Sequence, residues 1–154
     1  VVLEQGRVFA SGPIAEVMSR LDLPGAEDED AGVVLKATVA ERDADWHLLR
    51  AAFRGGSLWV QDNGVAIGRR LRLRVLARDV SLALTHCDDV SILNLLPGTV
   101  TAIAAGGHPA ARLAQIDIGG TLLLARLTAR SVHALDLRAG KRVWAQLKSV
   151  AVIE

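Results

Sequence analysis

The sequence contains a single cysteine, Cys87, so it cannot form an internal disulfide. Its four histidines are dispersed and show no zinc-ligand spacing. The residue types of a metal site or a cysteine nucleophile stand together in His86-Cys87-Asp88-Asp89, but they are adjacent in a predicted loop and no second histidine follows at ligand spacing. We therefore expect no metal site and a reducing, intracellular setting.

Aromatic residues are scarce, with three Trp, two Phe and no Tyr in 154 residues. Aliphatic side chains must therefore form the core. The net charge is only +1, whereas a chain that binds nucleic acid is usually strongly basic. Binding of single strands also needs exposed aromatic platforms on which bases stack. We therefore expect no nucleic-acid partner.

Long apolar runs are absent, although 51% of the residues are hydrophobic. No run approaches the roughly 18 to 20 residues that span a bilayer, and the first residues lack the pattern of a signal peptide. Catalytic patterns are missing too: we find no Gly-x-Ser-x-Gly elbow, no spaced carboxylate pair and no Gly-x-x-x-x-Gly-Lys-Ser/Thr phosphate loop. We expect a soluble chain with no catalytic residues and no nucleotide site.

The pattern that is present is one of short strands. Turn signals recur at intervals of about 8 to 12 residues, which is typical of a barrel or a sandwich. A short helix is expected over 128–135, with Thr128 as its N-cap. Leu71-Arg72-Leu73-Arg74-Val75 alternates strictly, which predicts an apolar face and a basic, solvated face, with an anion or nucleic-acid surface as the alternative. The predicted strands are 33–39, 46–53, 57–60, 71–84, 98–104, 111–118, 121–126 and 141–153.

The first 32 residues have a different character. Residues 1–12 alternate as a β-hairpin around Gln5-Gly6, and Ser11-Gly12-Pro13 begins a short helix. Glu27-Asp28-Glu29-Asp30 follows a Pro-Gly break and lacks the spaced ligands of a calcium loop, which indicates a linker. We predict four segments: a hairpin and helix over 1–22, a linker over 23–32, and two modules over 33–87 and 88–154.

The two modules are related by internal similarity. Arg78-Asp79-Val80-Ser81-Leu82 aligns with Lys148-Ser149-Val150-Ala151-Val152 at an offset of 70 residues, and the glycine pairs Gly55-Gly56 and Gly119-Gly120 occupy similar places. The chain length suits two small barrels of about 60 to 70 residues each. The predicted fold is all-β, with tandem OB-like five-stranded barrels, a short helix in the second barrel, and the hairpin and short helix in front.

Two stretches in the second module hold small polar and cationic residues among apolar neighbours: Ser91-Ile92-Leu93-Asn94 before a strand, and Lys148-Ser149 near the C-terminus. These stretches resemble the molybdate-binding mop domains, whose opening motif reads Ser-x-Arg-Asn and whose last strand carries Lys followed by Ser, Thr or Ala. Ala77 to Leu84 matches the same family's regulatory half. Nearly the whole chain resembles the C-terminal region of the ATP-binding subunit of a molybdate-import ABC transporter, with residues 1–22 as the end of the ATPase domain.

The resemblance implies a molybdate or tungstate site formed by Ser91, Asn94, Lys148 and Ser149. A tetrahedral dianion accepts hydrogen bonds and offers no proton at neutral pH, so hydroxyls, amides and one cation suit it. Arg78 and Ser81 of the first module are weaker candidates. Leu93 stands where the motif has arginine, so one cationic donor is missing.

The resemblance also implies partners. We expect a homodimer, contact with the chain's own ATPase domain, and association with a membrane-embedded permease through the full-length transporter. The location would be cytoplasmic and peripheral, at the inner face of the membrane. Two other functions stay open at this point: a single-stranded nucleic-acid-binding module, and a structural dimerisation domain that binds no ligand.

Overall fold

The computed structural model describes residues 2–4, 7–10 and 31–153. The first described elements are β1 (Val2–Glu4) and β2 (Arg7–Ala10), which pair antiparallel and so confirm the predicted hairpin. The helix predicted after Ser11 and most of the predicted linker lie outside the described residues. No helix within the described part of the chain is long and apolar enough to cross a membrane.

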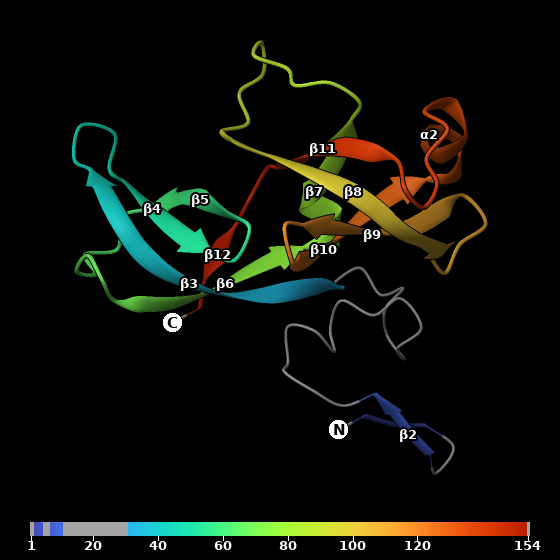
Figure 1. Ribbon diagram of the computed structural model, residues 1–154, viewed down its shortest axis with the longest axis horizontal. Helices are drawn as coiled ribbons and strands as arrows, with labels where there is room; N and C mark the ends of the chain where they lie inside the picture. Colours follow the sequence, from blue (N-terminus) through green and yellow to red (C-terminus); the bar gives the residue numbers. More distant parts are fainter. Residues whose placement is uncertain (1, 5–6, 11–30, 154) are drawn as a thin grey trace.

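Residues 31–153 form two antiparallel sheets of five strands each (Figure 1). The first sheet has the strand order β12-β6-β3-β4-β5 and the second has the order β10-β9-β8-β11-β7. The all-β fold with two five-stranded units is therefore confirmed. The strands are β3 (Gly32–Asp43), β4 (Leu48–Phe53), β5 (Gly56–Gln61), β6 (Arg70–Leu76), β7 (Val80–Ala83), β8 (Asn94–Ala105), β9 (Ala111–Ile118), β10 (Thr121–Thr128), β11 (Arg142–Leu147) and β12 (Ala151–Val152).

Each sheet takes its fifth strand from the other half of the chain. β7 follows β6 in sequence but pairs with β11 of the second sheet, whereas β12 follows β11 and pairs with β6 of the first. In Figure 1 the red β12 accordingly lies among the strands of the first sheet. The division of the chain at 87/88 follows the sequence repeat, and the two sheets do not follow that division.

This exchange explains why two predicted strands are interrupted. The segment 71–84 breaks at a short 3-10 helix, η1 (Ala77–Asp79), and the segment 141–153 breaks at Lys148, so that each half can enter a different sheet. The two breaks touch, because the backbone N–H of Lys148 donates to the carbonyl oxygen of Asp79 at 2.8 Å. The two segments that pass from one sheet to the other are therefore hydrogen-bonded to each other.

Local patterns within the strands agree with the sequence. On β6 the side chains of Leu71, Leu73 and Val75 are buried and that of Arg72 is exposed, as strict alternation predicts. α2 (Ala129–Ala134) begins after Thr128, whose hydroxyl accepts from the backbone N–H of Ser131 at 3.0 Å. The predicted N-cap is thus confirmed.

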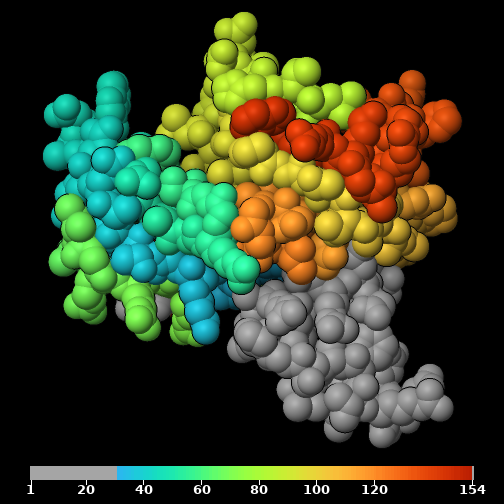
Figure 2. All heavy atoms as spheres, in the orientation of Figure 1, coloured from blue at the N-terminus to red at the C-terminus, as the bar shows by residue number. Residues whose placement is uncertain are grey.

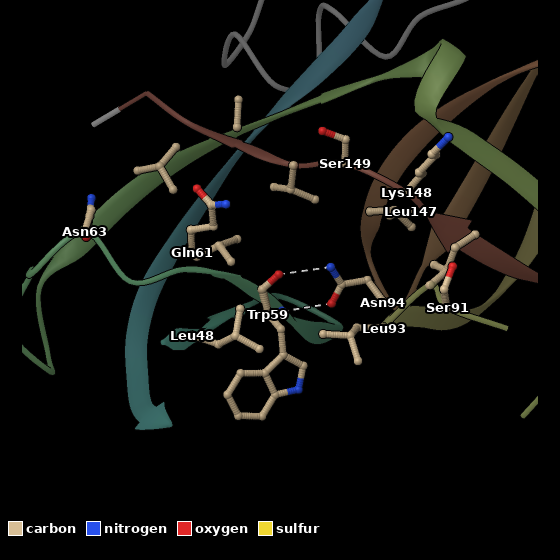
Figure 3. Close-up of a pocket in the computed structure, with 15 residues that line it drawn as sticks. Leu48, Trp59, Gln61, Asn63, Ser91, Leu93, Asn94, Leu147, Lys148 and Ser149 are labelled. Carbon is tan, nitrogen blue, oxygen red and sulfur yellow. Dashed lines mark hydrogen bonds between the residues drawn. The ribbon is translucent and has the colours of Figure 1, made fainter. Parts of the chain in front are cut away.

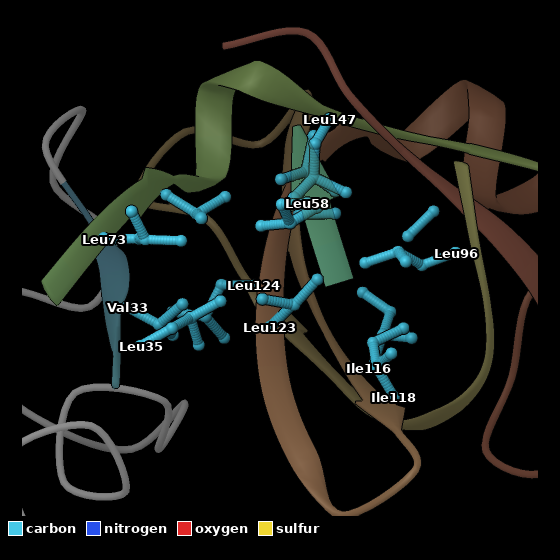
Figure 4. Packing of buried hydrophobic residues seen from close by; sticks show 14 of the residues in the cluster. Val33, Leu35, Leu58, Leu73, Leu96, Ile116, Ile118, Leu123, Leu124 and Leu147 are labelled. Carbon is cyan, nitrogen blue, oxygen red and sulfur yellow. The ribbon is translucent and has the colours of Figure 1, made fainter. Parts of the chain in front are cut away.

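One hydrophobic core runs through both sheets. Figure 4 shows Val33 and Leu35 of the first sheet facing Leu123 and Leu124 of β10. Burial of aliphatic side chains is worth roughly 1.5 to 3 kcal/mol each, so this shared core joins the two sheets into one unit. As the composition predicts, the fully buried large side chains are Leu, Ile and Val.

The two repeats also meet at their glycine turns. Gly55 has φ of +103°, and a Cβ placed on it would lie 1.9 Å from the carbonyl oxygen of Ile118. A Cβ on Gly119 would lie 2.8 Å from Cα of Gly55. The hydroxyl of Thr121 donates to the carbonyl oxygen of Arg54 across the same contact. In Figure 2 the green surface of the first sheet accordingly lies against the orange surface of the second.

Candidate functional site

A groove of about 880 Å³ opens beside the first sheet. It brings together Ser91, Asn94, Lys148 and Ser149, the four residues that the sequence motifs single out (Figure 3). They come from two segments more than fifty residues apart in sequence. The other lining residues are Leu48, Trp59, Val60, Gln61, Asn63, Ile92, Leu93, Leu147, Val150, Ala151 and Val152.

The groove lies between the edge strands of the first sheet. β5 forms one wall, and the segment that leads from β11 through β12 forms the other. In the second sheet the corresponding edge strands meet, because β10 packs against β7 and also against η1 and β3. β12 is only two residues long and leaves the first sheet open at this place. The site is therefore a gap in an incomplete barrel.

Asn94 ties the second module to β5 across this gap. Its Oδ1 accepts from the backbone N–H of Trp59 at 2.8 Å, and its Nδ2 donates to the carbonyl oxygen of Trp59 at 3.0 Å. Figure 3 shows the amide turned towards Trp59 through both of these bonds. The side chain thus satisfies the exposed edge of β5, and one N–H of its amide remains for a ligand.

Lys148 and Ser149 occupy the connection between β11 and β12, and both side chains are exposed. Within the described part of the chain, no carboxylate pairs with the Lys148 ammonium. The Lys148 backbone N–H is occupied by Asp79, so the ammonium group is the donor that this residue offers. In Figure 3 the two side chains project away from Asn94. The four candidates therefore share a groove without converging on one point.

Ser91 lies in the loop that leads into β8, three residues before that strand begins, and is exposed at the groove. Leu93, at the position of the motif arginine, is 63% exposed. A leucine side chain carries no hydrogen-bond donor for an anion. The wall that carries Ser91 therefore supplies a hydroxyl and an amide, and it supplies no cation.

Comparison with known proteins gives a family match for the second half of the chain. The family model described as "TOBE domain" matches residues 90–153. Those residues include Ser91, Asn94, Lys148 and Ser149 and form most of the second sheet together with β12. Residues 90–153, which match this model, are referred to as the TOBE domain.

Similarity to known proteins extends over the whole chain. The chain is 53% identical over 154 residues to the molybdenum import ATP-binding protein ModC of Methylococcus capsulatus, covering 100% of this chain and 43% of that protein. It is 52% identical over 153 residues to the protein of the same name from Thiobacillus denitrificans, covering 99% of this chain and 42% of that protein. The chain thus spans less than half the length of these relatives, and it is similar to their TOBE-containing part, as the motifs predict.

A solved structure supports the fold. The cytoplasmic molybdate-binding protein ModG, in a form with molybdate bound, superposes with a TM-score of 0.64 and 24% sequence identity. The match covers 77% of this chain and 93% of that chain. At this identity the likeness establishes the tandem barrel fold and no more.

The weaker candidates lie outside the groove. Ser81 is on β7, where its hydroxyl donates to Oε1 of Gln146 at 2.9 Å. Arg78 is an exposed residue of η1. Asp79 follows it where the TOBE domain has Ser149, so the related place in the first half carries a negative charge. Neither Arg78 nor Ser81 contributes to the groove lining.

Two amide side chains in the groove lie outside the sequence motifs. Gln61 ends β5 and Asn63 lies in the following turn, and both line the groove. Oδ1 of Asn63 accepts from the backbone N–H of Val65 at 3.2 Å. The sequence identifies Asp62-Asn63-Gly64 as a turn, but no local signal shows that this turn reaches the TOBE domain.

The turn beside the groove is fixed by an ion pair. Nε of Arg42 lies 2.7 Å from Oδ2 of Asp62, and the backbone N–H of Gly64 donates to Oδ1 of Asp62 at 2.8 Å. The hydrogen bond from Arg42, followed by that from Gly64, lowers the pKa of the Asp62 carboxyl below its ordinary value. Asp62 therefore stays ionised and is committed to the turn.

The loop before Ser91 contains His86, Cys87, Asp88 and Asp89, where the sequence predicts no metal site. His86 packs edge-on against Trp144 with 4.8 Å between the ring centroids, and its Nδ1 lies 3.0 Å from Oδ1 of Asp88. Among the described residues no group of three or more His, Cys, Asp or Glu side chains is placed to hold a metal ion. His86 thus contacts both its own loop and β11.

Proposed function

We propose that this chain is the oxyanion-binding regulatory region of the ATP-binding subunit of a molybdate importer. The observation that carries the proposal is the groove lining, in which two motif segments and β5 bring hydroxyls, amides and one ammonium together. None of the fifteen lining residues is a carboxylate. Such a lining suits a dianion that only accepts hydrogen bonds.

Similarity to the ModC proteins supports molybdate as the ion, and tungstate has the same charge and shape. Because Lys148 and Ser149 project away from Asn94, a second copy of the chain facing the groove would supply the remaining donors. We therefore include homodimerisation in the proposal. The location would be cytoplasmic, at the inner face of the membrane, through contacts of the full-length subunit with a permease. The fragment itself would have no enzymatic activity.

Binding is tested by calorimetry of the chain with molybdate, tungstate, sulfate and an oligonucleotide. We expect binding of molybdate and tungstate and none of the oligonucleotide. Binding of the oligonucleotide alone would favour the nucleic-acid module instead. Dimerisation without any binding would favour the structural domain.

The site is tested by Lys148→Ala against Arg72→Ala. Both changes remove one positive charge from an exposed side chain, so their long-range effects are matched. A hydrogen bond to a charged group contributes about 1.5 to 3 kcal/mol, which is roughly 10- to 150-fold in Kd. We expect that loss for Lys148→Ala and less than about twofold for Arg72→Ala. Equal losses would show that the ion binds elsewhere.

Regulation would follow from the placement of two such regions. A ligand shifts an equilibrium only by its differential affinity for the two arrangements, and a preference of about 100-fold supplies about 2.7 kcal/mol. That is enough to suppress most of a closed, ATP-hydrolysing state. The test is ATPase activity of the full transporter in rising molybdate. Inhibition that persists in a Lys148→Ala, Ser149→Ala double variant would exclude this site as the sensor.

A further inference from the structure

The groove is much larger than the ion proposed for it. A tetrahedral ion of four oxygens displaces roughly three to four waters, or about 100 Å³, whereas the groove measures about 880 Å³. The ion therefore contacts only part of the lining. Which part depends on the donors that the fold leaves uncommitted.

Gln61 is such a donor on the β5 wall. Its side chain is exposed, lines the groove and has no hydrogen-bond partner within the described part of the chain. Asn94 and Asn63 also line the groove, but Asn94 is bound to Trp59 through both amide atoms and Asn63 accepts from Val65. In Figure 3 Gln61 extends its amide from β5 towards the segment that carries Ser149.

The backbone of Gln61 faces the groove as well. In an antiparallel pair the residues alternate between those bonded to the neighbouring strand and those turned away from it. Trp59 is turned away from β4, because its N–H and carbonyl meet Asn94. Gln61 lies two residues further along β5, and the next residue, Asp62, donates its N–H back to His47 at 2.9 Å. The N–H of Gln61 therefore lies on the groove side.

The uncommitted donors of Gln61 matter because Leu93 stands where the motif has an arginine. Leu93 leaves the segment around Ser91 without a cationic donor, while Gln61 offers its amide NH₂ and its backbone N–H from β5. An anionic acceptor strengthens each neutral hydrogen bond that it receives. A glutamine at this place suits a dianion, whereas a glutamate would repel it.

We infer that Gln61 is a ligand of the bound oxyanion, donating through Nε2 and its backbone N–H from the first half of the chain. This inference rests on the proposed function, since it assigns a further residue to the same groove. It makes the site a joint product of β5 and the TOBE domain.

The test is calorimetry with molybdate on the whole chain carrying Gln61→Leu or Gln61→Glu. We expect Gln61→Leu to weaken binding five- to thirtyfold, because the backbone N–H remains. Gln61→Glu should weaken it more than 100-fold at pH 8. Gln115→Leu, on β9 outside the groove, is the control for loss of a glutamine amide elsewhere and should stay within twofold.

A pH series separates a ligand from a structural role. Glutamate has an ordinary pKa of about 4.3, and a bound dianion beside it would raise that pKa, so binding would take up a proton. The affinity of Gln61→Glu should therefore rise as the pH falls from 8 to 5.5, while those of the native chain and Gln61→Leu stay level. If the native chain binds and Gln61→Leu binds equally well, Gln61 is not a ligand and the proposed function stands. If the native chain does not bind at all, both proposals fail.

Discussion

The clamp between Asn94 and Trp59 makes a specific prediction about stability. Asn94 supplies both an acceptor and a donor to the edge of β5, at 2.8 and 3.0 Å. Asn94→Ala removes both bonds and leaves the Trp59 N–H and carbonyl in a partly closed groove. It also breaks the direct tie between β5 and the start of β8.

The magnitude follows from the two bonds. A net hydrogen bond contributes about 0.5 to 1.5 kcal/mol, so the pair contributes about 1 to 3 kcal/mol. For a chain of this size 1 kcal/mol shifts the melting temperature by about 2 to 4 °C. We expect Asn94→Ala to lower the free energy of unfolding by about 2 kcal/mol and the melting temperature by about 4 to 8 °C.

Urea denaturation of the native chain and two variants is the assay. Asn63→Ala is the control, because Asn63 lines the same groove but makes one exposed bond of 3.2 Å to Val65 within its own turn. It should cost at most about 1 kcal/mol. If Asn94→Ala lies within about 0.5 kcal/mol of the native chain, or costs no more than Asn63→Ala, the clamp does not stabilise the fold.

Two further predictions concern the turns. Gly55→Ala should destabilise the chain by at least about 2 kcal/mol in urea denaturation, because the new Cβ would meet Ile118 at a positive φ. Gly64→Ala, also at positive φ but with nothing within 4 Å, should cost less, and equal costs would show that the contact between repeats does not matter. The pKa of Asp62 is lowered chiefly by the hydrogen bond from Arg42, so its contribution is present above the unfolded pKa of about 3.9 and lost as pH falls through the folded value. The melting temperature of Asp62→Asn should therefore lie below the native value at pH 7 and approach it below about pH 4, and a gap independent of pH would contradict this.

Much of the fold can be predicted from local patterns. Alternation places Leu71, Leu73 and Val75 in the core, and Thr128 marks the start of α2, because both signals depend on neighbours in sequence. The strand predicted over 46–53 begins at Leu48, because His47 adopts a positive φ in the turn. Local physics thus determines which residues form strands and, to within two residues here, where this strand begins.

The pairing of the last strands could not be predicted in this way. The apolar pattern of β7 is the same whether it joins the first sheet or the second, since alternation specifies a buried face and not a neighbour. The short η1 between β6 and β7 redirects the chain, and its sequence carries no glycine or proline that would reveal a turn. Which strand β7 pairs with depends on packing throughout the core.

The sequence motifs identify residues that line one groove, but they do not indicate the geometry of that groove. The motif residues do meet in one groove, but the amide of Asn94 can serve a ligand or a backbone, and only the structure shows that it holds Trp59. Gln61 lies outside every motif. Gln61 reaches the groove because β5 forms one wall of that groove. This placement depends on the tertiary structure and not on the local sequence.

The exchanged strands make the two halves mutually dependent fragments. A cut between residues 87 and 88 would leave one half without β12 and the other without β7, so each fragment would expose a sheet edge that its counterpart normally covers. Neither fragment should be soluble by itself, while the two produced together should recombine and restore a single unfolding transition. The unit that folds is therefore the pair of repeats, with each repeat completing the sheet of the other.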